Sequence, residues 1–344
     1  MILNVGNRKL NFWSKYTVSL RFDSIASVFS FSYYYDNESR TNTDISAVLD
    51  YKKCSLIEGN KTILTGVILN HGFGSEVAKE LSSISGYSLP GILNDVVMPP
   101  ASYPLQFDKL TLKEITNKLC KPFGINFIIM PSVASLMNAP IEETEIEPTE
   151  KVGEYLAKMA SDRNIVLTHS PEGYLVFTKA ETEGVSVFDF GGDSVATSKA
   201  LSVNGQGMYS EVTALAESDD IPANASEETI KNPYVEEFRP TVVVQTSGSS
   251  VSTKETARTA LGQQLKNIKL TVHVARLTDK NGNLWKPNTI ITVVDDDLKI
   301  FKKSRFFIEE VTFSVDTKSE TAVLTCVVPE VYNNEEIISI FRTW

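Results

Sequence analysis

The chain has 344 residues, of which 42% are hydrophobic and 22% are charged, and its net charge at pH 7 is −10. Such a composition is typical of a globular protein and excludes a disordered one, while the length favours two or three domains. The acidic balance argues against a protein that grips nucleic-acid phosphates, because no stretch gathers enough Lys and Arg for a basic footprint.

The start of the sequence, the length of its apolar runs and its cysteines indicate where the protein is located. The start, "MILNVGNRKLNFW", has no basic segment followed by an unbroken apolar run, so we expect no secretory signal. The longest apolar runs, such as "INFIIM", are far shorter than the ~20 residues that span a bilayer, so no membrane insertion is expected. Cys54, Cys120 and Cys326 are far apart and odd in number, which favours reduced thiols in a cytoplasm.

The first 85 residues predict antiparallel β structure. Residues 16–22 and 28–35 alternate between apolar and polar side chains, the period of a half-buried strand. Residues 54–69 read as two strands joined by a turn at 58–61. Gly66 inside the second of these strands indicates a bulge or a close approach of the backbone. A small barrel or sandwich is the expected form.

The middle region changes character after a proline-rich boundary. Pro90 suits the first turn of a short helix, and the run from Pro99 to Pro104 ends it. Residues 112–119 and 152–159 each show helical spacing and are each followed by a strand, which predicts an α/β module. The acidic segment "IEETEIEPTE" between these units is predicted to be a solvated loop, because its carboxylates lack the spacing of a calcium loop.

From residue 186 the chain predicts β structure again. Residues 217–240 have few apolar anchors and read as a long arm over a neighbour. A helix is expected from Ser252 or Thr253, and its small residues Ala257, Ala260 and Gly262 indicate close packing. Three strands are expected next, in "IKLTVHVARL", "NTIITVVDD" and "RFFIEEVTFSV". A hairpin at "DTKSE" then leads to the last long strand, "TAVLTCVVPE".

No catalytic or metal-binding pattern is visible. His71, in a predicted loop, and His169 and His273 have no Cys or carboxylate at metal-ligand spacing. The run Asp295 to Asp297 cannot converge on one ion within a strand, because neighbouring side chains point to opposite faces. We therefore predict no enzyme and no cofactor.

The order of the features resembles a known family. "EGNKTILTGVIL", "SISGYSLPGILNDVV" and "TLKEITNKLCKPFGINFII" are followed by "PEGYLVF", "FRPTVVV", "NGNLWKPNTIITVVDDDLKI" and "RFFIEEVTFSVDTKSETAVLTCVVPE". Together they resemble the baseplate hub protein of contractile phage tails, the Mu-type tail protein family. The chain departs from that family at Tyr87, where a basic residue is expected, and in its long 217–240 excursion.

The resemblance implies a mixed, mainly β fold. It places a first tube-like antiparallel β-barrel domain in residues 1–98, a small α/β module in 99–185 and a second β-barrel domain in 186–344. It further implies a homotrimer that forms a pseudo-six-fold ring and joins the tail tube to a three-fold central spike. The tape-measure and baseplate wedge proteins are further expected partners, and the expected location is the virion tail baseplate, assembled in the host cytoplasm.

Five residues are predicted to have structural or interface roles: Gly66, Gly86, Trp285, Pro287 and Trp344. Trp285, beside the "NG" turn, is expected to cap the end of the second barrel in preference to contacting the next subunit. An acidic lumen lining from Asp295 to Asp297, which would keep passing DNA from sticking, is a further hypothesis.

Three rival functions remain open from the sequence. One is the hub of a contractile injection system or a pyocin-like particle. Another is a tail-associated cell-wall hydrolase, although no pair of carboxylates stands out for it. The last is a carbohydrate-binding β-sandwich protein, against which core burial of the aromatic residues is the better expectation.

Overall fold

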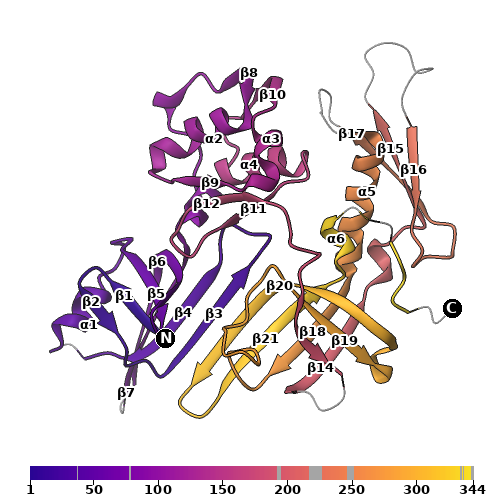
Figure 1. The fold of residues 1–344 in the computed structure, drawn as a ribbon. Helices are drawn as coiled ribbons and strands as arrows, with labels where there is room; N and C mark the ends of the chain where they lie inside the picture. The colour runs from indigo at the N-terminus through magenta and orange to yellow at the C-terminus, as the bar shows by residue number, and fades with distance from the viewer. Residues whose placement is uncertain are drawn as a thin grey trace.

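The computed structural model describes residues 1–36, 38–76, 79–191, 195–216, 227–245, 252–333, 335 and 337–341. Figure 1 shows a broad layer of strands with two smaller parts on one side of it, an α/β module and a helix with a small sheet. The mainly β fold class expected from the sequence is confirmed. None of the helices in the described ranges is long and apolar enough to cross a bilayer.

One sheet of 13 strands runs through both β parts. Its order is β14-β18-β21-β20-β3-β4-β7-β6-β5-β1-β2, with β13 and β19 joined to it at β20. The N-terminal elements are β1 (Ile2–Val5), β2 (Arg8–Leu10), β3 (Lys15–Arg21), β4 (Val28–Tyr34), α1 (Arg40–Ile45), β5 (Lys53–Glu58), β6 (Lys61–Glu76) and β7 (Lys79–Ser88). The C-terminal strands are β13 (Ser186–Phe190), β14 (Ala196–Val203), β18 (Ile268–Val274), β19 (Thr289–Asp295), β20 (Ile300–Asp316) and β21 (Glu320–Val327).

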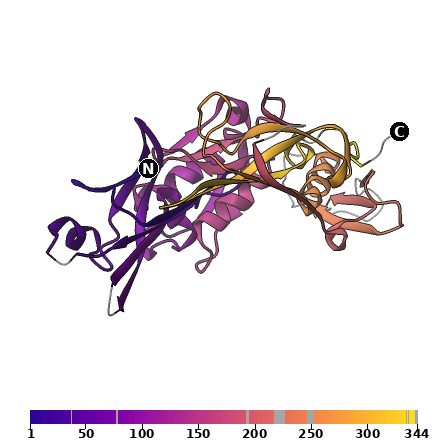
Figure 2. The ribbon, with the colours of Figure 1, turned by 90° about the horizontal axis from the view of Figure 1, so that it is seen from below.

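Strand β20 joins the two β parts because it is long enough to pair with both. Its first half pairs with β19 as far as Ile308, and its second half, from Glu310 to Asp316, pairs with β3. The register with β21 shifts between Ile308 and Glu310, so Glu309 is the extra residue of a bulge at the crossover. Figure 2, seen from below, shows the two β parts as one continuous layer. We call the β3–β20 pairing the seam.

The buried side chains of the two β parts share one apolar core. Phe29 and Phe31 of β4 belong to the same cluster as Phe307 and Phe313 of β20 and Trp285. Each fully buried aromatic of this kind contributes about 1.5–3 kcal/mol to the free energy of unfolding. The domain boundaries at residues 98 and 185 stay a prediction. The apolar core is continuous between the N-terminal and the C-terminal β parts.

The six C-terminal strands curl so that their ends approach each other. β13 and β14 lie at opposite ends of this group and are consecutive in the sequence. Lys199 of β14 forms an ion pair with Asp295 at the end of β19. The tube-like barrel form of the second β part stays a prediction.

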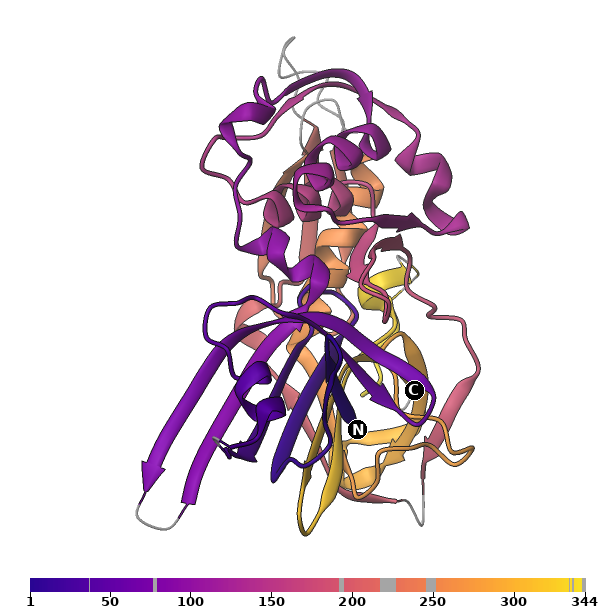
Figure 3. The same ribbon diagram turned by 90° about the vertical axis from the view of Figure 1, so that its left-hand side faces the viewer.

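The long hairpin β6–β7, which projects from the sheet in Figure 3, depends on two glycines. A Cβ atom at position 66 would lie 2.2 Å from the backbone oxygen of Tyr87, and one at position 86 would lie 1.9 Å from the backbone oxygen of Val67. The close backbone approach expected at Gly66 is therefore present, and Gly86 supplies the matching one on the other strand. Only glycine fits where two backbones come this close.

The α/β module has its own apolar core. Its elements are η1 (Leu89–Asn94), β8 (Gln106–Thr111), α2 (Leu112–Cys120), β9 (Phe127–Ile129), α3 (Ala134–Met137), β10 (Pro140–Glu145), α4 (Val152–Ser161), β11 (Val166–His169) and β12 (Leu175–Thr178). Both predicted helix-then-strand units, α2–β9 and α4–β11, are confirmed. Thr111 and Glu114 form a reciprocal capping box that starts α2. Buried side chains of α2, α4, β11 and β12 pack into one cluster that also holds Ile25 of the N-terminal part.

The last part adds a three-stranded sheet with a helix against it. Its elements are β15 (Glu211–Ala216), β16 (Glu227–Lys231), β17 (Pro240–Gln245), α5 (Thr253–Gln264) and α6 (Glu330–Asn333). Ser252 caps α5 as expected. A Cβ at Gly262 would lie 2.9 Å from the backbone oxygen of Glu330, so the close packing expected from small residues is confirmed. Of the predicted arm, residues 217–226 lie outside the described ranges, and β16 pairs with β15.

Two local predictions were wrong. The acidic segment is not a loop at its start, because residues 140–145 form β10 and pair with β8. Edge strands commonly carry charged side chains, so their polarity hides them from a pattern search. His71 lies within β6 rather than in a loop. The neighbouring glycines resemble a turn, but pairing with β7 keeps this segment extended.

We predict that Gly86→Ala destabilises the protein by more than about 2 kcal/mol, because its Cβ cannot be placed without moving the Val67 backbone. Urea unfolding followed by circular dichroism measures this free energy. Gly205→Ala is the control, since its Cβ would meet nothing within 4 Å, and it should change stability by less than about 0.5 kcal/mol. Equal effects of the two substitutions would contradict the close approach.

Candidate functional site

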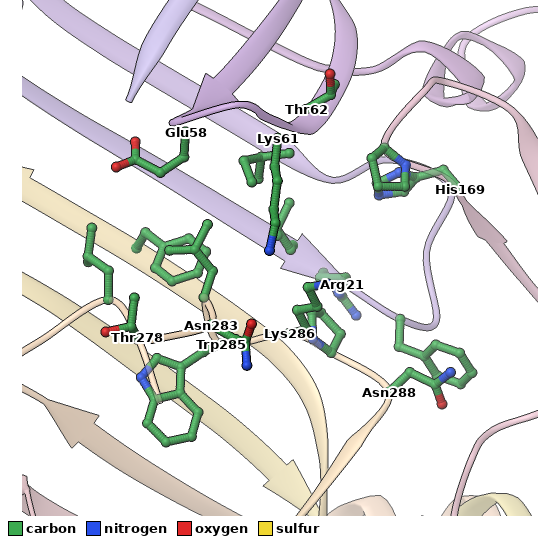
Figure 4. A pocket seen from close by; sticks show the side chains of 18 of the residues that line it. Arg21, Glu58, Lys61, Thr62, His169, Thr278, Asn283, Trp285, Lys286 and Asn288 are labelled. Atoms are coloured by element: carbon green, nitrogen blue, oxygen red, sulfur yellow. The ribbon is translucent and has the colours of Figure 1, made fainter. Parts of the chain in front are cut away.

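A cleft of about 750 Å³ lies where the two β parts and the α/β module meet (Figure 4). Its walls come from the β5–β6 turn, from the end of β11 and β12, and from residues 277–288, while Leu20 and Phe313 belong to the seam. Most of the exposed lining is apolar. Pockets of roughly 300–1,000 Å³ accommodate several side chains or a drug-sized molecule. We call this space the central cleft.

The loop that contributes Trp285 to the cleft is a tight turn. The carboxylate of Asp279 accepts the backbone N–H groups of Asn281 and Asn283 at 2.8 and 2.9 Å. Gly282 has a φ of 77°, which an L side chain rarely adopts. The "NG" turn predicted from the sequence is thus confirmed, and it fixes the direction in which the chain enters β19.

Trp285 itself closes the core beneath the cleft. It is 1% exposed, and its ring lies 6.1 Å from that of Phe190 and 5.7 Å from that of Phe188. Its indole nitrogen has no hydrogen-bond partner among the described residues. The ring is therefore buried in the core, while capping of a barrel end and contact with another subunit stay predictions.

Two lysines face the central cleft from different β parts. Lys61 belongs to the β5–β6 turn and Lys286 to the loop after Trp285, and both are labelled in Figure 4. Neither has a carboxylate within 4.0 Å in the described part of the chain. Glu58, on the same side as Lys61, is already paired with the amino group of Met1 at 2.6 Å. The cleft therefore offers two cations without local partners.

A histidine joins the module to the N-terminal β part at the rim of the cleft. His169 Nε2 lies 2.6 Å from the hydroxyl of Ser27, and its Nδ1 lies 3.2 Å from the carbonyl oxygen of Ser170. A carbonyl only accepts, so Nδ1 carries the proton and Nε2 accepts from Ser27. Burial lowers the pKa of His169, which keeps the ring neutral. Ser27 is fully buried, so this pair serves as a structural link and not as an accessible nucleophile.

A group of charged side chains lies on the other side of the seam. Lys266 Nζ lies 2.9 Å from Asp23 and 3.2 Å from Glu309, the bulge residue of β20. Arg21 of β3 also pairs with Asp23, at 3.2 Å, and the hydroxyl of Tyr332 donates to Glu309. Burial alone would raise the pKa of Asp23, but Lys266 and Arg21 outweigh it and lower that pKa. The group connects the start of the chain with the 3-10 helix η7 (Leu265–Asn267) after α5, with β20 and with α6.

The other predicted site residues lie apart from one another. Pro287 lines the central cleft next to Lys286. Gly66 and Gly86 lie at the β6–β7 crossing, outside the cleft lining. Trp344 lies outside the described residues. Their roles at interfaces stay predictions.

Of the three aspartates at the end of β19, Asp295 has structural partners for its carboxylate. Asp295 accepts the backbone N–H groups of Asp297 and Leu298 and pairs with Lys199. No group of three metal-ligating side chains occurs among the described residues. Cys54, Cys120 and Cys326 are buried free thiols, and burial raises the pKa of each. The chemistry of these residues supports packing and capping.

Sequence reasoning missed the residues that connect the parts. Lys61 looked like a turn residue, and Ser27 and Lys266 belong to no pattern. Ser27 lies 142 residues from its partner His169 in the sequence, and Lys266 lies 243 residues from its partner Asp23. The one available signal was the pair of adjacent acids Glu309 and Glu310, which follow the apolar run Phe306 to Ile308 within β20.

The α/β module is similar to a domain of known proteins. Residues 91–179 match the family model of the second domain of gp44-like baseplate hub proteins. The chain is thus similar to phage-tail baseplate hub proteins, and the resemblance predicted from the sequence is confirmed. One relative is the baseplate hub protein gp44 of Escherichia phage Mu, which is 23% identical over 326 residues, or 90% of this chain and 82% of the relative.

Solved structures share the fold. The 43 kDa tail protein of prophage MuSo2 from Shewanella oneidensis has a TM-score of 0.79 at 21% identity, covering 96% of this chain and 98% of that one. The E. coli c3393 protein, a component of the type VI secretion system, has a TM-score of 0.58 at 12% identity, covering 95% and 76%. At these identities the likeness concerns the fold.

We predict that Asp23→Asn lowers the free energy of unfolding at pH 7 by about 1–3 kcal/mol, because Lys266 and Arg21 lose a charged partner. The pKa of Asp23 is lowered in the folded protein, so its stabilisation is present above the unfolded value near ~3.9 and is lost as the pH falls through the folded value. Urea unfolding between pH 7 and pH 2.5 should show the difference between variant and wild type shrinking with acidification. Asp296→Asn, at an exposed aspartate, is the control, and a constant difference at all pH values would contradict the assignment.

We predict that Trp285→Phe stays within about 1 kcal/mol of the wild type, because it keeps a ring beside Phe190 and removes a donor without a described partner. Trp285→Ala should cost about 3–5 kcal/mol through the cavity it leaves. Trp13→Phe is the matched control, since its indole donates to the Met1 carbonyl at 3.0 Å. If Trp285→Phe is as damaging as Trp285→Ala, the indole N–H has a role that packing does not explain.

Proposed function

We propose that this protein is the structural baseplate hub of a contractile phage tail. In this proposal three copies form a ring of six similar β parts, which joins the six-fold tail tube to a three-fold central spike. The protein works by symmetry matching and by holding a sealed channel, and it carries no catalytic activity. Its location is the tail baseplate of the virion.

The observation that carries the proposal is the seam. Two β parts of one chain lie side by side in one continuous sheet and share one core, which makes each chain a pair of linked ring segments. Three such pairs give a ring of six segments that has three-fold symmetry. Head-to-tail contacts between copies form such a ring when the rotation between them closes. The similarity to gp44 of phage Mu supports the same assignment.

The proposed partners follow from this position. The tail tube and the central spike would contact opposite faces of the ring, and the tape-measure and wedge proteins are further candidates. No stable contact with nucleic acid is proposed, because the chain has a net charge of −10.

A mass measurement tests the ring. Light scattering on a sizing column should give about three times the 38.1 kDa of the chain. The measurement is repeated with the spike protein of the same tail, and a ring-forming hub then elutes as one complex with it. A monomer under both conditions would contradict the proposal.

The fold also favours one rival assignment, the hub of a contractile injection system, because a type VI secretion component shares it. Capsid genes beside the gene would favour the phage, and their absence the injection system. A zymogram on peptidoglycan addresses the cell-wall hydrolase, which clearing of the gel would support.

A further inference from the structure

An exposed apolar loop follows helix α1. Val48, Leu49 and Tyr51 are 59%, 69% and 58% exposed, and Asp50 lies among them. We call residues 48–51 the knob. Three large apolar side chains in water within four residues are unusual for a surface that contacts only solvent.

The backbone of the knob is strained. Leu49 and Tyr51 have φ values of 59° and 46°, in the left-handed region that bulky side chains rarely adopt. Lys52 holds the loop in place: its carbonyl accepts from Ile68 N at 3.0 Å, and its amino group lies 3.2 Å from Asp50 and also donates to the Asp44 carbonyl. Strain that the surroundings maintain at an exposed position is typical of a binding element.

The central cleft has the properties that the knob needs in a partner. It is lined mostly by apolar atoms, and about 750 Å³ is enough for two or three side chains. Lys61 and Lys286 face it without a carboxylate partner among the described residues. Among the described residues, the exposed Asp50 forms an ion pair with the half-buried Lys52 alone, and such pairs near the surface are weak enough to exchange.

A knob cannot reach the cleft of its own chain. β5 runs from the knob at one end to Glu58 and the cleft at the other, and its six residues span roughly 20 Å. The two surfaces are therefore unlike, separate and rigidly connected. Complementary, unlike surfaces on one chain make head-to-tail contacts, which form a ring when the rotation between successive copies closes.

We propose that the knob of one copy docks into the central cleft of the next copy, with Leu49 entering the apolar lining and Asp50 pairing with Lys61 or Lys286. This inference rests on the proposed homotrimer. It assigns to the cleft a specific occupant, a second copy of this chain.

Two single substitutions test the contact in the full chain. Leu49→Asn removes the apolar side chain, and asparagine tolerates the left-handed region, so the fold should be kept. Lys286→Glu reverses a charge on an exposed loop of the cleft. Each should raise by about tenfold or more the protein concentration at which the trimer forms, as light scattering measures it. Val185→Asn, at a 92% exposed apolar residue outside both surfaces, should leave that concentration unchanged.

Mixing the two variants gives a sharper readout. In a mixture, the intact knob of the Lys286→Glu chain meets the intact cleft of the Leu49→Asn chain, while every other contact is impaired. The expected product is a dimer that neither variant forms alone. Thermal unfolding of each monomer, unchanged from that of the wild type, shows that the substitutions act on assembly and not on folding.

The outcomes separate the two proposals. If both variants form trimers at the wild-type concentration, or if the mixture yields no dimer, the knob and cleft are not the contact and the homotrimer stands. If the wild type is a monomer at every concentration, self-assembly through the knob and cleft is overturned. The proposed hub function is then judged by the measurement with the spike protein.

Discussion

The pairing of β3 with the second half of β20 is the constraint on which the rest of the structure depends. Backbone hydrogen bonds from Lys15 to Arg21 tie the beginning of the chain to a strand almost 300 residues later, which makes two β parts into one sheet. At the end of this pairing the Glu309 bulge redirects β20 toward β19. Lys266, held between Asp23 and Glu309, brings the 3-10 helix η7 after α5 to the same point.

The seam explains where the other features lie. Because β3 and β20 are fixed side by side, the β5–β6 turn and the loop before β19 face each other across a gap. The module closes this gap from a third side, where His169 accepts a hydrogen bond from buried Ser27. A rigid arrangement of this kind suits the proposed hub, whose function depends on its surfaces.

The sequence predicted local features of the candidate site better than their combination. It located Trp285 beside a tight turn, because Asn281 and Gly282 define that turn through backbone geometry alone. It also indicated a close backbone approach at Gly66. It did not connect Lys61 with Lys286, or Ser27 with His169, since pairs so distant along the chain leave no periodic signal. The sequence also did not predict the edge strand β10, because its many charged side chains conceal the apolar alternation of a strand.

By itself, the sequence determined the mainly β class, the two helix-then-strand units, the cap of α5 and the order of motifs that indicates a phage-tail hub. These follow from side-chain periodicity, capping and turn chemistry, which act over a few residues. Only the tertiary structure decided that both β parts share one sheet and one core, that a cleft lies between three parts and that an apolar knob lies at the far end of β5. Pairing between strands from opposite ends of the chain selects that arrangement, and its energy depends on which edges meet in space.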